Sequence, residues 1–122
     1  MMAFGRDGLL KKGEVDDVVA YVRSLSDPAA AKDVPAAKIE AGKAVFAANC
    51  VTCHGDNAKG NVELGAPDLT DKSWIYGGDA ESIYDTVWGG RQGHMPSWDG
   101  RLSPLDRKIL ALYLFDIGRR DA

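Results

Sequence analysis

The chain has 122 residues, of which 45% are hydrophobic and 27% charged, a composition typical of one globular domain with at most a fragment of another. The formal net charge is −3 and no cluster of basic residues is present, so nucleic acid is not an expected partner. The apolar stretches are far shorter than the roughly 20 residues that cross a bilayer, and the N-terminus has no secretory signal pattern, so we expect a soluble chain.

The first 37 residues separate into a helical segment and a linker. Val15, Val18, Val19 and Val22 recur at helical spacing and predict an amphipathic helix within residues 1–25. The next residues, 26–37, include two prolines and five alanines, which is typical of a linker. The remaining residues, 38–122, are long enough to form one domain.

The most informative motif reads C-x-x-C-H at residues 50–54 and follows a predicted helix over residues 38–49. This spacing is the attachment signature of c-type haem. In such a site the thiols of Cys50 and Cys53 bond to the haem vinyl groups, and the imidazole of His54 ligates the iron. The motif therefore predicts one covalently attached haem c.

Three other interpretations of the two cysteines stay open. A thioredoxin-like dithiol would require a strand before the motif and a βαβ pattern, neither of which is visible. A zinc site could draw on Cys50, Cys53, His54 and His94, although two of these ligands are adjacent in sequence. A structural disulfide across two intervening residues would be strained.

Two further helices are predicted after the motif. Asp79 is a good N-cap for a helix over residues 80–88, which Gly89 would end. A second helix should begin at Ser103 and Pro104 and end at Gly118. Because no segment alternates like a strand, we expect an all-α fold, with helices around one haem.

The second axial position of the iron has few candidates. Met95 and His94 lie together in a glycine-rich loop where the chain can approach a flat ring, whereas Met1 and Met2 lie outside the C-terminal domain. A thioether opposite an imidazole raises the reduction potential and suits electron transfer, so we favour Met95. Ligation by His94 would give a bis-histidine iron of lower potential.

Several ordered motifs resemble class I cytochrome c. They are Gly42-x-x-x-Phe46 before the haem motif, Gly65-Ala66-Pro67, Met95-Pro96 and Leu110-x-x-Tyr113. The resemblance implies that the first helix crosses the last one at Gly42, against Tyr113. It also implies that the carbonyl of Pro67 accepts a hydrogen bond from Nδ1 of His54, which fixes the imidazole tautomer.

A closer resemblance is to the di-haem cytochrome c subunit, subunit III, of cbb(3)-type terminal oxidases. It rests on residues 60–61, 63–71, 74–79 and 90–91. That subunit has two cytochrome c domains in tandem behind a membrane anchor, on the periplasmic side of the bacterial inner membrane. The resemblance implies that electrons come from a donor cytochrome or the cytochrome bc complex and pass to the haem-copper catalytic subunit.

The N-terminal segment repeats the end of the chain. Residues 1–4 parallel residues 95–98, and residues 18–21 parallel residues 110–113. We therefore interpret residues 1–25 as the last loop and helix of an upstream haem domain, in which Met1 or Met2 would have been the ligand. In the rival interpretation, the segment is an extra helix that packs on the haem domain or on a second copy, giving a homodimer.

These observations predict an electron carrier that is not an enzyme by itself. Arg91, Tyr76, Trp74 and Trp98 are candidates to hold or shield the haem propionates, because guanidinium and indole N–H groups are good donors to anions. Two alternatives stay open. One is a free-standing periplasmic cytochrome c, and the other is a gas-binding or peroxide-reducing haem protein with a labile Met95.

Overall fold

A computed structural model describes residues 1–120, which form two units, Met1–Gln92 and a second one that begins at Gly93. The elements are helical, and in the described part of the chain the only β pairing is an isolated bridge between Asn61 and Ala66. The expected all-α fold class is confirmed. No helix among residues 1–120 is both long and apolar enough to cross a lipid bilayer.

The first long helix, α1 (Lys12–Ser26), forms much of the core of the first unit. The backbone N–H of Lys11 donates to the carboxylate of Glu14 at 2.8 Å, which stabilises the start of the helix. Four valines on one face are buried, with exposed fractions of 5% or less. They are the predicted residues Val15, Val18, Val19 and Val22.

The next elements lead to the C-x-x-C-H motif. The predicted linker contains a short 3-10 helix, η1 (Pro28–Ala31), and the side chain of Asp27 accepts hydrogen bonds from its first turn. Then follow α2 (Ala36–Asn49) and α3 (Val51–His54). Since α2 begins just after Pro35, it includes two residues more than the predicted 38–49.

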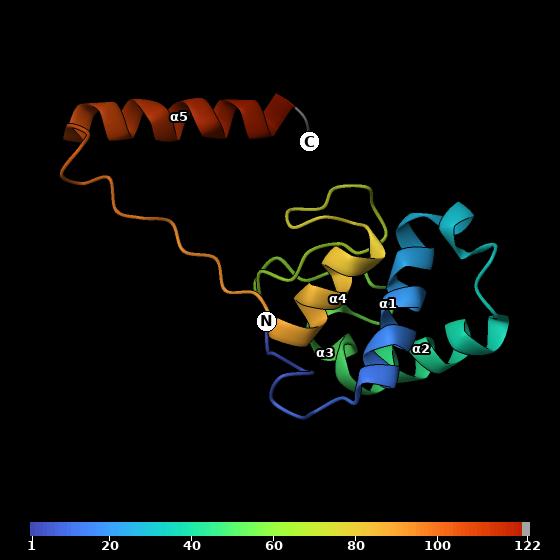
Figure 1. Ribbon diagram of the computed structural model, residues 1–122. Helices are drawn as coiled ribbons and strands as arrows, with labels where there is room; N and C mark the ends of the chain where they lie inside the picture. Colours follow the sequence, from blue (N-terminus) through green and yellow to red (C-terminus); the bar gives the residue numbers. More distant parts are fainter. Residues whose placement is uncertain (121–122) are drawn as a thin grey trace. The chain divides into compact units, whose positions relative to one another are not determined.

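Helix α4 (Ala80–Gly89) completes the packing of the first unit. The carboxylate of Asp79 accepts from the backbone N–H of Ser82 at 2.9 Å, so the predicted N-cap is confirmed. Helix α1 packs against both α2 and α4 (Figure 1). The core joins the α1 valines to Phe46 of α2 and to Ile83 and Val87 of α4.

The segment before α1 is held by the end of α4. The backbone N–H of Phe4 donates to the carbonyl of Val87 at 3.1 Å, and that of Arg6 donates to the carbonyl of Trp88 at 3.0 Å. A Cβ atom at Gly5 would lie 2.0 Å from the indole ring of Trp88, so only glycine allows this approach. Residues 1–26 are therefore an integral part of the first unit.

The second unit contains α5 (Pro104–Arg120). The hydroxyl of Ser103 accepts from the backbone N–H of Asp106 at 3.1 Å, which confirms the predicted start of this helix; its end lies two residues beyond the predicted Gly118. The apolar side chains of α5 are exposed, from 37% for Ile117 to 68% for Leu112.

Candidate functional site

Both cysteines of the motif lie on one helical turn. Cys50 joins α2 to α3, and its carbonyl accepts the backbone N–H of His54 at 2.9 Å. Cys53 lies three residues after Cys50, so both side chains belong to one face. Neither thiol is in a disulfide, and Cys53 is exposed while Cys50 is half-buried. They are placed so that both can bond to a single flat group.

The surroundings of Cys50 make its thiol less acidic. Burial raises the pKa of Cys50 to about 11, and the nearby thiol of Cys53 contributes to the same shift. Cys50 is therefore protonated at neutral pH in the folded chain. The thiol of Cys50 therefore lacks the lowered pKa that activates a thioredoxin-like dithiol, and the structure offers that interpretation no support.

His54 is oriented by the loop that follows it. Its Nδ1 atom lies 3.1 Å from the carbonyl oxygen of Pro67, which is the contact that the resemblance to cytochrome c implies. A carbonyl oxygen can only accept, so the imidazole donates its Nδ1 hydrogen and keeps the lone pair of Nε2 for a metal. The hydrogen bond also makes the imidazole a better electron donor.

Gly60, for which no role was predicted, allows the chain to bring Pro67 close to His54. Gly60 has φ +82°, and a Cβ atom there would lie 2.3 Å from the carbonyl oxygen of Ala66 and 2.7 Å from that of Pro67. Its backbone N–H donates to the carbonyl of His54 at 2.8 Å. Two hydrogen bonds between Asn61 and Ala66, both 2.9 Å long, close the loop. The pair Gly60-Asn61 is the sequence feature that could have revealed this loop, because Gly-Asn favours turns with positive φ.

Two of the four propionate candidates lie together. The guanidinium of Arg91 stacks 4.3 Å from the ring centre of Tyr76, and its Nε donates to the hydroxyl of Thr86 at 3.0 Å. These contacts hold a positive charge in a defined position at the end of α4.

The two tryptophans among the candidates lie in different units. Trp74 is half-buried beside Gly78, where a Cβ atom would lie 2.7 Å from the indole Nε1. Trp98 is in the second unit, and the guanidinium of Arg101 lies 4.9 Å from its ring centre. That these indoles shield haem propionates stays a prediction.

The candidate axial ligands His94 and Met95 belong to the second unit. The side chain of Met95 is 83% exposed and His94 is also exposed. Ligation of an iron bound to His54 by either residue remains a prediction. Among residues 1–120, no three histidine, cysteine, aspartate or glutamate side chains lie together as metal ligands would.

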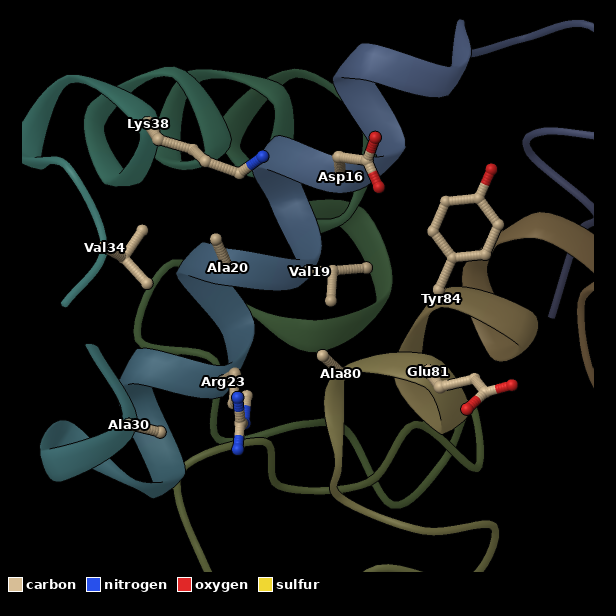
Figure 2. Close-up of a pocket in the computed structure, with 10 residues that line it drawn as sticks. All are labelled: Asp16, Val19, Ala20, Arg23, Ala30, Val34, Lys38, Ala80, Glu81 and Tyr84. Carbon is tan, nitrogen blue, oxygen red and sulfur yellow. The ribbon is translucent and has the colours of Figure 1, made fainter.

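One pocket of the first unit is lined by none of the motif residues. It is a groove of about 410 Å³ between α1, η1, α2 and the start of α4 (Figure 2). Val19, Ala20 and Ala80 give it an apolar lining, with Asp16 and Arg23 among the charged residues around it. It contains none of the predicted haem residues.

The sequence of this chain is similar to a defined group of proteins. Residues 37–114 match the family described as Cytochrome C oxidase, cbb3-type, subunit III. The Cbb3-type cytochrome c oxidase subunit FixP of a Bradyrhizobium species is 52% identical over 118 residues, which are 97% of this chain and 40% of that protein.

Two relatives from other genera also match 97% of this chain, over 41% of the Rhodobacter capsulatus protein and 40% of the Azospirillum brasilense protein. The Cbb3-type cytochrome c oxidase subunit CcoP of Rhodobacter capsulatus is 47% identical over 125 residues, and that of Azospirillum brasilense is 41% identical over 122 residues. The chain spans about two fifths of the length of the curated relatives it matches. Since the family match covers more than half of the chain, the resemblance noted from the motifs is confirmed: this chain belongs to the cbb3-type cytochrome c oxidase subunit III family and contains its cytochrome c domain.

Proposed function

We propose that this chain is an electron-transfer module that carries one haem c on Cys50 and Cys53, with His54 as an iron ligand. The observation that carries the proposal is the 3.1 Å contact between Nδ1 of His54 and the carbonyl of Pro67, next to two free thiols on one helical turn. These residues fit a haem, because the imidazole has one defined free nitrogen and the thiols share a face. When bound, the haem iron exchanges one electron without breaking any substrate bond.

The protein residues would hold the iron in nearly the same environment in both redox states. Pro67 fixes the orientation of His54, and Met95 is the proposed second ligand, which would raise the reduction potential and leave no open position. Arg91, stacked on Tyr76, would neutralise haem carboxylates. Trp74 and Trp98 would shield them. Because these groups would already be in place before the electron arrives, the reorganisation energy of electron transfer would stay small.

The names of the relatives support a place in a respiratory chain. We propose that this domain belongs to a cbb3-type oxidase complex on the periplasmic side of a bacterial inner membrane. Electrons would enter from a donor cytochrome or the cytochrome bc complex and leave to the haem-copper catalytic subunit. In this proposal, residues 38–122 are the cytochrome c domain, residues 26–37 a linker, and residues 1–25 the end of an upstream haem domain.

Absorption spectra of the haem-loaded protein test the proposal. We expect a low-spin c-type spectrum in both redox states, a far-red methionine band in the ferric protein, and no change with carbon monoxide. Met95→Leu should remove the band, lower the potential and open the iron, whereas the matched variant Met2→Leu should change none of these. Loss of the band in Met2→Leu alone would refute the assignment of Met95. Rapid binding of carbon monoxide by the parent would instead favour the gas-binding alternative.

A further inference from the structure

Three polar side chains join the two ends of the loop that contains Pro67. The ammonium group of Lys59, where the loop begins, donates to the hydroxyl oxygen of Thr70, where it ends, at 2.6 Å. The same hydroxyl donates its own hydrogen to the carboxylate of Asp68 at 2.6 Å, and the backbone N–H of Thr70 donates to that carboxylate at 2.7 Å. Lys59, Asp68 and Thr70 therefore form one hydrogen-bonded group, the loop cluster.

The contacts between Asp68 and Thr70 are the strongest part of the loop cluster. The ion pair between Lys59 and Asp68 is 3.5 Å long and the side chain of Lys59 is more than half exposed, so water screens this attraction. The two bonds from Thr70 end on a charged acceptor, which makes them stronger than bonds between neutral groups. They are the main reason why the pKa of Asp68 lies below its ordinary value. Asp68 and Thr70 are therefore the residues to change in a test.

The loop cluster restrains the peptide group whose oxygen faces His54. The carbonyl of Pro67 belongs to the planar peptide group that joins Pro67 to Asp68. Because the proline ring fixes φ of Pro67, this group can turn only through ψ of Pro67 and φ of Asp68. The loop cluster holds Asp68, and the next residue, Leu69, is held by a 2.8 Å hydrogen bond from its backbone N–H to the carbonyl of Ala58. The direction of the Pro67 carbonyl is therefore fixed from the Asp68 side.

We propose that Asp68 and Thr70 are positioning residues, which hold the Pro67 carbonyl against Nδ1 of His54 and thereby tune the reduction potential of an iron bound to His54. This inference rests on the proposed function, because the potential is that of the proposed haem. The hydrogen bond at Nδ1, 3.1 Å long, makes the imidazole a better electron donor and so favours ferric iron. Loosening the loop cluster should therefore raise the reduction potential.

Two variants of Thr70 in the full, haem-loaded chain test the proposal. Thr70→Val removes the hydroxyl without changing the net charge, whereas the matched control Thr70→Ser keeps the hydroxyl. Thr70→Val should raise the reduction potential, and the Nδ1 proton of His54, followed by NMR in the ferrous protein, should exchange with solvent at least about tenfold faster than in the parent. Thr70→Ser should behave like the parent. A Thr70→Val variant with a lower melting temperature but unchanged potential and proton exchange would overturn the proposal, because the hydroxyl would then have only a structural role.

A second pair of variants tests the proposal even where Thr70→Val fails to fold. Asp68→Ala and the matched control Asp71→Ala each remove one carboxylate, but Asp71 accepts from the backbone N–H of Ser73 at 2.8 Å and lies outside the loop cluster. The Nδ1 proton of His54 should exchange faster in Asp68→Ala alone. Equal exchange in these two variants would overturn the role of the loop cluster while leaving the haem site intact. A parent that takes up no haem would instead overturn the proposed function, and this inference with it.

Discussion

Replacing Gly42 by alanine tests whether the close crossing of α1 and α2 controls stability. On helix propensity alone the change would stabilise the protein by about 1 kcal/mol. The new methyl group would instead lie 2.0 Å from the carbonyl oxygen and 2.6 Å from the carbonyl carbon of Asp17. Both are backbone atoms, so no side-chain rotation relieves the overlap, and α1 must move away.

The cost follows from what α1 buries. Overpacking of this kind typically costs about 1–3 kcal/mol, and separating the helices also loosens the contacts of Val18 and Val15, the most buried side chains of the unit. We expect a net loss of about 2 kcal/mol, which lowers the melting temperature of a domain of this size by roughly 10 °C.

Thermal unfolding of the haem-loaded protein, followed by circular dichroism, measures this loss. Gly13→Ala is the matched control, because Gly13 lies in α1 with no atom within 4 Å of its added Cβ. The Gly13→Ala variant should be as stable as the parent protein or more stable by up to about 1 kcal/mol. If Gly42→Ala is as stable as Gly13→Ala, α1 and α2 do not cross as closely as these distances require.

Two further predictions concern the loop and the thiols of the motif. Gly60→Ala should push the Pro67 carbonyl away from His54, destabilise the haem-loaded protein and shift its reduction potential, whereas Gly65→Ala, which also has positive φ but open space around its Cβ, should cost only backbone strain. Equal melting temperatures and potentials in the two variants would contradict this role of Gly60. For the chain without attached haem, the raised pKa of Cys50, about 11, means that the folded state holds this proton more tightly than the unfolded state does. Stability should therefore be complete below about pH 9, the ordinary thiol value, and fall by about 2 kcal/mol as the pH rises to about 11. Urea unfolding across this range should show a slope that Cys50→Ala abolishes; an identical slope in that variant would rule out the buried thiol as its cause.

Much of the local structure could be predicted because its signals are local. Asp79 and Ser103 marked the starts of α4 and α5, and the spacing of the valines marked the buried face of α1. The position of the cysteine motif at the end of a helix followed from the apolar pattern before it. Each of these features depends on residues within a few positions of one another.

The partner of Gly42 could not be predicted in the same way. The resemblance assigns this contact to Tyr113. In the first unit Gly42 instead lies against α1, because a Cβ atom there would lie 2.0 Å from the carbonyl oxygen of Asp17 and 2.8 Å from Cβ of Tyr21. A close contact between helices that are far apart in sequence depends on how the whole unit packs, which the local spacing of residues does not reveal. The role of Gly60 was missed for a similar reason, since its crowding comes from the carbonyl groups of a closed loop.

The mass of the intact protein, matured with the haem-attachment machinery and measured after denaturation, tests the central claim most directly. The account predicts one covalently bound haem per chain, and a weaker attachment through a single bond in Cys50→Ala and in Cys53→Ala. A parent protein that keeps the mass of the bare polypeptide under these conditions would contradict the proposed haem c site.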